Sequence, residues 1–374
     1  IAPWFTVATL VLAALTLVGW WVARGAAPAI ANTVAVLVVA CPCALALAHP
    51  LAAAAGLAAA ARRGLLLRSS GNLLDLAGVT VAGLDKTGTV TAGTIAVTEA
   101  ADATLRVAAG LERFSLHPIA RAITAEAGRR GIPLPRPEDV RETPGRGISG
   151  IVDGIRWELT TAGPGAVRLG RADGPAGTAA DQVIHLGDTT RIDARRTIEA
   201  FRGLGVEPVL LTGDHEDVAR AVGRDADLAE VRARLSPADK SAWVRERQRA
   251  GATVLFAGDG LNDGPALAAA DVGIAMASGA ASTLLVADGI VSTGSLAPVI
   301  AGIRAGRAAE RMIRRSLRQA VAYNLVSMGA AAFGLVNPLV AAVLMPVSSA
   351  LVIWTSARVE HLVRRQDTCA PTSS

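Results

Sequence analysis

The sequence predicts a multi-domain α/β protein that also carries transmembrane helices, and two observations support this. First, three long stretches contain no Asp, Glu, Lys or Arg, namely residues 4–23, 25–61 and 319–357. Second, the polar segment between them alternates short β-rich runs with helical patterns, which is typical of a parallel α/β sheet. The apolar content of 51% and the mean hydropathy of +0.41 also exceed those of ordinary soluble enzymes.

The three uncharged stretches predict four membrane spans. A helix needs about 20 apolar residues to cross a bilayer. The first stretch predicts one helix and the second predicts one long helix, so that residues 1–64 hold two spans. In the third stretch, Gly334, Asn337 and Pro338 are expected to separate two helices, which places two further spans in residues 316–358.

The arginines that flank these stretches fall on one side of the predicted membrane, except Arg24, which falls on the other side. Because positive charge marks the cytosolic side of a membrane, we expect residues 65–315 and the tail 359–374 to be cytosolic. The protein would then be an integral protein of the cell membrane with cytosolic catalytic domains. Membrane-flanking arginine also explains the net charge of +5, and nucleic-acid binding is not expected. The flanking residues are Arg62, Arg63, Arg68, Arg304, Arg307, Arg311, Arg314, Arg315, Arg318, Arg358, Arg364 and Arg365.

Three β-rich runs of the polar segment each end at an acidic loop that contains glycine. These runs are Val79 to Leu84, Glu207 to Leu211 and Thr253 to Ala257. Functional groups collect at such carboxyl ends of parallel strands. Between residues 97 and 183 the pattern changes to a helix, a glycine-rich turn and short strands, which predicts a smaller α+β domain inserted between residues 65–96 and 184–315 of the sheet domain.

The motif that follows the first run is the most specific one in the chain. It reads Asp85-Lys86-Thr87-Gly88-Thr89. Downstream come Thr212-Gly213-Asp214, then Pro237 and Lys240, then Gly258-Asp259-Gly260-Leu261-Asn262-Asp263-Gly264. Any one of these loops alone reads as an ordinary turn. In this order, over nearly the whole chain, they resemble the P-type ATPases, whose phosphorylation domain is haloacid-dehalogenase-like.

The resemblance implies a phosphoryl-transfer site with ATP and Mg²⁺ as cofactors. Asp85 would be the nucleophile and Lys240 would neutralise phosphoryl charge. The catalytic set also includes Lys86, Thr87, Thr212, Gly213 and Asp214. Magnesium would be held by Asp85 and Asp259, with Thr87, Asn262 and Asp263 completing its surroundings.

Position 87 separates a pump from a membrane-tethered phosphatase. Phosphatases of this superfamily place a second Asp two residues after the nucleophile, as general acid and base. Here that residue is Thr87, so the aspartyl phosphate should persist long enough to be coupled to a conformational change. A non-catalytic copper-binding regulator is a third interpretation, against which the intact Asp85, Lys240, Asp259 and Asp263 argue.

Two motifs in the inserted segment resemble the nucleotide-binding domain of the heavy-metal subgroup. The first is Ser115, His117 and Pro118 around Leu116, and the second is the glycine set Gly145, Gly147 and Gly150. A lone G-x-G-x-x-G is weak evidence, and a lone His is usually structural. Their order after the phosphorylation motif implies that they contact ATP. One departure is Leu116, where related pumps often have Glu.

Cys41-Pro42-Cys43 lies in the middle of the second stretch and predicts the transport site. Proline frees backbone carbonyls, and two thiols flank it. In isolation this could be a kink with two small apolar residues, but ahead of the phosphorylation motif it resembles the subgroup's metal-translocation signature. Soft ligands and an uncharged third stretch favour Cu⁺ or Ag⁺ over Zn²⁺ or Cd²⁺, a Zn/Cd-type pump being the alternative. The resemblance adds Tyr323, Asn324, Met345 and Ser349 as ligands, and His49 is a further candidate for a ligand, a proton acceptor or a pore-lining group.

The expected cargo is therefore monovalent copper, moved outward from the cytosol. A copper chaperone or a metal-binding domain is an expected partner, together with ATP and the lipid bilayer. No Thr-Gly-Glu loop of an actuator domain and no Cys-x-x-Cys metal-binding motif occurs in the sequence. We expect both to lie N-terminal to Ile1. Cys41, Cys43 and Cys369 do not predict a disulfide scaffold.

Overall fold

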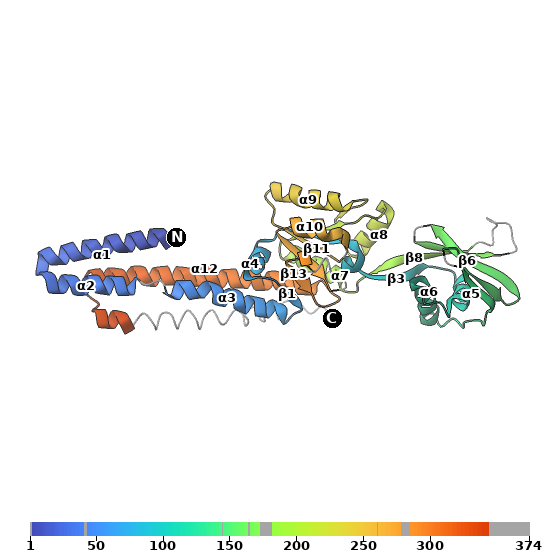
Figure 1. Ribbon diagram of the computed structural model, residues 1–374, viewed down its shortest axis with the longest axis horizontal. Coiled ribbons are helices and arrows are strands. Elements are labelled where there is room, and N and C mark those ends of the chain that lie inside the picture. Colours follow the sequence, from blue (N-terminus) through green and yellow to red (C-terminus); the bar gives the residue numbers. More distant parts are fainter. Residues whose placement is uncertain are drawn as a thin grey trace.

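The computed structural model describes residues 2–40, 43–143, 145–163, 165–172, 182–259, 261–277 and 285–343. The protein is elongated, with long helices at one end, an α/β sheet domain in the middle and a smaller β-rich domain at the other end (Figure 1). The predicted class, an α/β protein with an inserted α+β domain and long apolar helices, is confirmed.

The first two uncharged stretches form three helices. These are α1 (Ala2–Arg24), α2 (Ala26–Val39) and α3 (Cys43–Ala61). Gly25 separates α1 from α2 with a φ of +87°, a conformation that glycine adopts without steric cost. Of the described helices, Thr6–Arg24 is long and apolar enough to cross a membrane, whereas Ala26–Val39 and His49–Ala61 are shorter apolar helices.

The prediction of one long helix over residues 25–61 was wrong. Helix α2 ends at Val39, where the amide of Ala40 donates 3.0 Å to the carbonyl of Val36, and α3 begins only at Cys43. Proline has no amide hydrogen and clashes with the preceding turn, so Pro42 does not support a continuous helix. Cys41 and Pro42 lie outside the described residues.

A single helix of 36 residues, α12 (Ala297–Ala332), connects the sheet domain to the apolar helices (Figure 1). It packs on α3 and α4 (Ser70–Gly78) and also on α2. The predicted domain boundary between residues 315 and 316 therefore falls inside one helix. The expected break follows at Gly334, with a φ of +75°, and helical structure resumes over residues 338–343 after Asn337 Oδ1 accepts a hydrogen bond from the Val340 amide at 2.8 Å.

The central sheet has seven strands in the order β1-β13-β12-β11-β2-β9-β10. All neighbours are parallel except β1 and β13. The three β-rich runs named above form β2, β9 and β11, which lie side by side in this sheet. The strands are β1 (Leu65–Leu67), β2 (Val81–Asp85), β9 (Glu207–Leu211), β10 (Glu230–Arg232), β11 (Val254–Gly258), β12 (Val272–Met276) and β13 (Gly289–Val291).

Helices cover both faces of the sheet. Side chains of a strand alternate between the two faces, so the strands contribute apolar side chains to a core on each side. Leu84 and Leu210 pack into one core with residues of α4, α7 (Ala194–Gly203), α8 (Glu216–Asp225) and α12. On the other face, Val81 and Phe256 pack against Trp243 of α9 (Pro237–Arg249) and Leu267 of α10 (Gly264–Ala269). The fully buried strands explain why these runs are continuously apolar.

The inserted domain is a six-stranded antiparallel sheet, β3-β8-β7-β6-β5-β4, with two helices. Its core, which includes Leu105, Ile123 and Leu169, is separate from the cores of the sheet domain. Strands β3 and β8 reach beyond the predicted limits of 97 and 183. The elements are β3 (Thr91–Glu99), α5 (Asp102–Glu112), α6 (Pro118–Arg129), β4 (Glu138–Thr143), β5 (Gly147–Val152), β6 (Ile155–Gly163), β7 (Ala166–Arg171) and β8 (Gln182–Thr190).

Candidate active site

Asp85 is the last residue of β2, at the carboxyl edge of the sheet between β11 and β9. The chain then turns through Lys86–Val90, and Gly88 in this turn has a φ of +70°. A Cβ atom at Gly88 would collide with the carboxylate of Asp259, so only glycine lets the turn pass this close. Strand β2 therefore positions the carboxylate of Asp85 at the edge of the sheet, and Gly88 allows the carboxylate of Asp259 to approach the following turn closely.

Helix α9 carries Lys240, the positively charged side chain of the site. Its first turn is fixed by a capping box in which Ser236 Oγ accepts from the Asp239 amide at 3.2 Å and Asp239 Oδ2 accepts from the Ser236 amide at 2.9 Å. Lys240 follows directly and is buried. Its Nζ donates to Asp85 Oδ1 and, at 2.8 Å, to Asp263 Oδ1.

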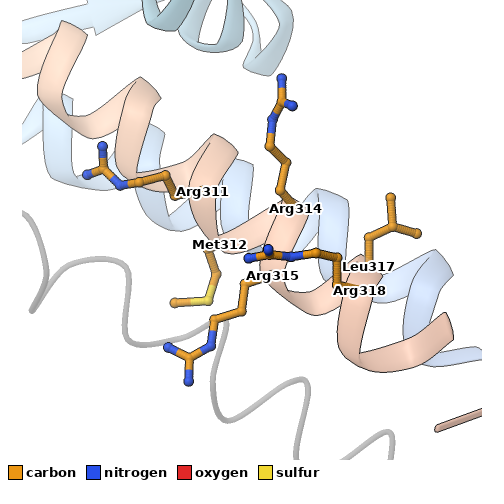
Figure 2. Close-up of a pocket in the computed structure, with 6 residues that line it drawn as sticks. All are labelled: Arg311, Met312, Arg314, Arg315, Leu317 and Arg318. Atoms are coloured by element: carbon orange, nitrogen blue, oxygen red, sulfur yellow. The ribbon is translucent and has the colours of Figure 1, made fainter. Parts of the chain in front are cut away.

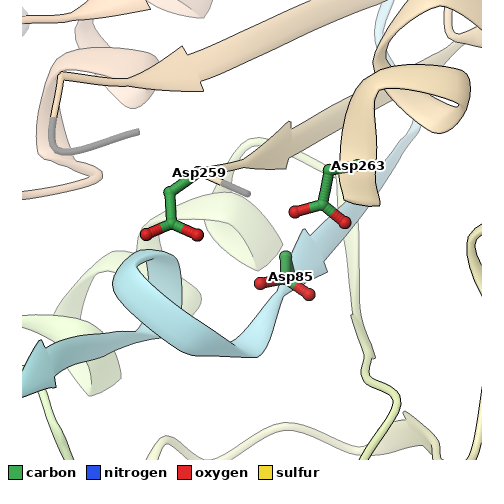
Figure 3. A group of neighbouring side chains, drawn as sticks. All are labelled: Asp85, Asp259 and Asp263. Atoms are coloured by element: carbon green, nitrogen blue, oxygen red, sulfur yellow. The ribbon is translucent and has the colours of Figure 1, made fainter. Parts of the chain in front are cut away.

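Three carboxylates converge at the same edge (Figure 3). Asp85, Asp259 and Asp263 each offer an oxygen within 4.8 Å of the others. Carboxylate oxygens at this spacing are the hard ligands that Mg²⁺ prefers, and Lys240 compensates only one of their negative charges. The residues present therefore fit a divalent cation.

Burial and the neighbouring charges shift the pKa values of three residues in this cluster. Burial, together with Asp263, raises the pKa of Asp85 to about 6, against the opposing effect of Lys240. Burial and the neighbouring Asp263 and Asp188 raise the pKa of Asp259 as well. Although burial disfavours the charge of Lys240, Asp85 and Asp263 raise the pKa of its ammonium group. The three carboxylates therefore favour the binding of a cation, and the ammonium group of Lys240 stays positively charged beside them.

The remaining predicted catalytic residues surround Asp85. Lys86 is buried and forms an ion pair with Asp214. Thr212 is buried, and its Oγ1 accepts from the Asp214 amide at 3.2 Å, which shapes the loop after β9. Thr87 and Gly213 are exposed beside them, as is Asn262 in the turn Leu261–Asp263, so all three can be reached by a substrate.

Arg191 was missed by the sequence analysis. Its guanidinium donates to the carbonyls of Gly88 at 2.6 Å and Thr89 at 2.9 Å, and also to the carbonyl of Gly294. It follows β8 directly, so it connects the returning strand of the inserted domain to the turn after Asp85. No motif distinguishes this arginine from others in the sequence.

His117 and Pro118 of the inserted domain begin helix α6. His117 is the N-cap, and its Nδ1 accepts from the Ile119 amide at 3.3 Å, while Pro118 occupies the first helical turn. Ser115 Oγ accepts from the His117 amide at 3.2 Å. The exposed side chains of Phe114 and Leu116, 76% and 81% accessible, leave an apolar surface beside the exposed imidazole.

Glu112 is a second residue that the sequence analysis missed. It ends α5 and is buried, and burial with the nearby Glu142 raises its pKa to about 7. Glu142 lies on β4, in the hairpin whose turn contains Gly145. The two carboxyls repel each other across the space between the His117 loop and the glycine hairpin. The sequence signal that could have indicated Glu112 is a charged residue at the end of a mostly apolar helix.

The glycines bring the hairpin close to α5. Gly145 and Gly147 have φ values of +78° and +136°, and a Cβ at Gly147 would meet the carbonyl of Leu159. A Cβ at Gly150 would lie 2.9 Å from Cδ2 of Leu111 on α5. The two predicted nucleotide motifs thus lie on neighbouring elements of one domain.

The predicted transport residues are only partly described. Cys41, Met345 and Ser349 lie outside the described residues, and Cys43 is the first residue of α3. Tyr323 and Asn324 lie on α12, which packs against α2 and α3, and Asn324 is buried. The hydroxyl of Tyr323 is buried without a hydrogen-bond partner among the described residues. His49 is exposed on α3.

Comparison with known proteins identifies the family of this fold and site. The model of the haloacid dehalogenase-like hydrolases matches residues 79–271, which includes Asp85, Lys240 and all three carboxylates of Figure 3. Copper-transporting ATPase 1 of Rhizobium meliloti is 35% identical over 97% of this chain and 48% of its own length. The copper-exporting P-type ATPase of Mycobacterium tuberculosis is 35% identical over 96% and 50%. The chain spans about half the length of the curated relatives it matches.

Solved structures agree. A zinc-transporting PIB-type ATPase in its E2.Pi state matches with a TM-score of 0.84 and 32% identity, over 95% of this chain and 62% of that one. The catalytic domain of the CPx-ATPase CopB-B, whose conformation changes on nucleotide binding, matches with a TM-score of 0.53 and 28% identity over 65% of this chain and 96% of its own. The chain therefore belongs to the haloacid dehalogenase-like hydrolase family, and its homologues over nearly its whole length are heavy-metal P-type ATPases.

Proposed function

We propose that the chain is the catalytic and metal-conducting part of a pump that uses ATP to export monovalent copper through an aspartyl-phosphate intermediate. The observation that carries the catalytic half is the cluster at the carboxyl edge of the sheet, where buried Lys240 contacts both Asp85 and Asp263. The names of the copper-transporting relatives support the cargo. Asp85, Asp259 and Asp263 would hold Mg²⁺, which supplies charge neutralisation to the phosphates when bound.

Asp85 would act as the nucleophile. One carboxylate oxygen attacks the γ-phosphorus of ATP, a new O–P bond forms, and the bond to the β,γ-bridging oxygen breaks so that ADP leaves with the electron pair. Lys240 holds positive charge beside the oxygens that become more negative. Lys86, fixed by Asp214, and the exposed Thr87 and Gly213 border the space that the phosphoryl group would occupy.

Thr87 explains why such an intermediate would last. It stands where a superfamily phosphatase carries its general acid and base, and a hydroxyl cannot act as a base near neutral pH. Among the described residues, Asp259 and Asp263 each have a carboxylate oxygen within 4.8 Å of one of Asp85, and both are assigned to the cation. The phosphorylated state would therefore survive until another domain supplies a base.

The copper assignment rests on ligand chemistry. Cys41 and Cys43 would offer two thiolates, and Cys43 is the first residue of α3. Residues 319–357 carry no charge, whereas a divalent ion would favour a carboxylate there. The orphaned Tyr323 hydroxyl and the buried Asn324 are the described polar groups that would complete the site, with Met345 and Ser349 as further candidates. The protein would sit in the cell membrane with its catalytic domains in the cytosol, receiving copper from a chaperone or a metal-binding domain.

Phosphorylation by ATP tests the catalytic half. With Mg²⁺ and γ-labelled ATP, the chain should incorporate acid-stable, hydroxylamine-labile phosphate, and Asp85→Asn should abolish it. Asp225→Asn, an exposed carboxylate change on α8, is the matched control. Undiminished labelling of Asp85→Asn would refute the assignment of the nucleophile.

X-ray absorption on copper-loaded protein tests the cargo. We expect a sulfur first shell that disappears in Cys41→Ser/Cys43→Ser and survives in Cys369→Ser, the third cysteine of the chain. A shell of oxygen and nitrogen would exclude the proposed site. The zinc-transporting structural relative makes zinc the second candidate, and tighter binding of Zn²⁺ than of Cu⁺ would favour it.

A further inference from the structure

Four arginines gather on α12 where it leaves the sheet domain. Arg311, Arg314, Arg315 and Arg318 line a hollow of about 650 Å³ together with Met312 and Leu317 (Figure 2). The arginine side chains are exposed and project from two turns of the same helix, with Arg314 pointing away from Met312 and Arg315 (Figure 2). The hollow thus combines a charged rim with a small apolar surface.

The charge of this hollow is not neutralised by the part of the chain that the structure describes. Arg314 pairs with Glu310 at 2.6 Å, while Arg311, Arg315 and Arg318 have no ion pair among those residues. Four arginines against one glutamate leave a net charge of +3 over residues 310–318. Like charges three and four residues apart destabilise a helix, so a bound anion would relieve the repulsion within this cluster.

Arg307 shows what a structural arginine of the same helix does. Its guanidinium donates to the carbonyls of Ala77 at 3.1 Å, Leu204 at 2.6 Å and Val79 at 3.4 Å. The fold uses this side chain to fasten α12 to the sheet domain. Three of the four arginines that line the hollow make no comparable contact with described residues.

The position of the hollow identifies the anion. Directly after Arg318 begins the uncharged stretch 319–357. If the chain spans a membrane as proposed above, the arginines lie at the level of the cytosolic headgroups. The planar guanidinium binds phosphate oxygens in pairs, and the membrane surface on this side is rich in anionic lipid. Met312 and Leu317 can contact the glycerol and the first methylenes.

We propose that this hollow binds the phosphate headgroup of an anionic phospholipid of the cytosolic leaflet. The inference rests on the proposed membrane function. Inorganic phosphate offers the same oxygens but no apolar part, and an acidic protein surface would not need the apolar contacts. A bound lipid would anchor α12 at the point where it enters the bilayer.

Native mass spectrometry of the full chain in detergent can test this. Phosphatidylglycerol and phosphatidylcholine are added at equal concentration, and the retained copies of each are counted for the wild type and for Arg315→Gln/Arg318→Gln. We expect the wild type to prefer phosphatidylglycerol and the variant to lose about fivefold in that preference per arginine removed. Arg245→Gln/Arg249→Gln, an equal loss of exposed charge on α9, should retain it.

A charge-conserving variant separates a binding site from general attraction. Arg315→Lys/Arg318→Lys keeps the charge but not the paired hydrogen bonds, so its preference should fall between the wild type and the glutamine variant. Full preference in the lysine or the glutamine variant, or equal competition by inorganic phosphate, would overturn the proposal. Retention of phosphatidylcholine without any preference would overturn it while leaving membrane insertion intact, whereas failure to retain any lipid would overturn both.

Discussion

Single residues set the electrostatics of this protein, and Asp85 is the clearest case. Its buried carboxyl has a pKa near 6 when folded and 3.8 ordinarily, so the folded state disfavours the charged form. Stability is therefore lost as the pH rises from the unfolded value through the folded one. At pH 7 the loss amounts to at most about 3 kcal/mol, because each unit of pKa corresponds to about 1.4 kcal/mol.

Asp85→Asn should therefore stabilise the magnesium-free protein. We expect a higher unfolding temperature than wild type at pH 7.5, with a difference that shrinks toward pH 4.5 because the wild-type carboxyl is then protonated. Thermal unfolding followed by circular dichroism across this range measures it, with Asp225→Asn as the control. A difference that stays constant with pH would contradict the assigned cause.

Glu112 predicts a pH dependence of nucleotide binding. Its pKa of about 7 means that it loses its negative charge as the pH falls below neutrality, next to the predicted site of an anionic nucleotide. We expect ATP to bind several-fold more tightly at pH 6 than at pH 8. Glu112→Gln should bind at both pH values as the wild type does at pH 6.

Titration calorimetry with magnesium and ATP provides the measurement. Asp153→Asn, an exposed carboxylate of the same domain that pairs with Arg106, serves as the control for lost charge. An unchanged pH dependence in Glu112→Gln would show that this carboxyl does not influence the nucleotide.

At the scale of elements, hydrogen bonds between residues far apart in the chain hold helix α12 against the sheet domain. Arg307 on α12 donates to three carbonyls, two from the segment around α4 and one from the end of α7. Arg307→Ala leaves these carbonyls without their partner and should lower the free energy of unfolding by about 2 to 4 kcal/mol. Arg314→Ala removes only an exposed pair with Glu310 and should cost less than about 1 kcal/mol.

Denaturant unfolding of the two variants, monitored by tryptophan fluorescence, distinguishes these effects. Equal loss of stability would mean that the Arg307 contacts add nothing beyond surface charge.

The elements also show how far the sequence could predict this structure. Strands β2, β9 and β11 were predictable because an apolar run buried on both faces ends at a polar loop. The joining of Asp85, Lys240 and Asp263 was foreseeable only through their family resemblance, since Lys240 comes from a helix 155 residues later. Arg191 could not be predicted, because its role depends on hydrogen bonds to three backbone carbonyls, and no local sequence pattern indicates such contacts. The end of α2 at Val39 was missed because the uniformly apolar composition of residues 25–61 gives no local sign of it.

At the scale of the whole molecule, the inserted domain is joined to the rest by neighbouring strands. Thr91 of β3 pairs with Thr190 of β8, so the two connections lie side by side, and the domain has its own core. We therefore expect residues 91–190 to fold alone and to bind ATP. His117→Ala should weaken binding about tenfold or more if the imidazole contacts the nucleotide.

Calorimetry on the isolated segment checks this, with a matched substitution of an exposed residue on α6, Arg121→Ala, as the control. A folded segment with no affinity for millimolar ATP would show that the nucleotide needs the sheet domain as well.

The uninterrupted course of α12 also has a mechanical consequence. Thirty-six residues of α-helix measure about 54 Å, and Arg307, about three turns from the first residue, fastens the helix to the sheet domain. The part of the helix beyond Arg307 is about 38 Å long, so tilting it there by about 5° would displace its far end by about 3 Å. That end meets α2, and the carbonyl of Ala332 accepts a hydrogen bond from Trp20 Nε1 at 2.8 Å. In the proposed pump, α12 would therefore act as a lever that carries movements of the sheet domain to the apolar helices α1 and α2.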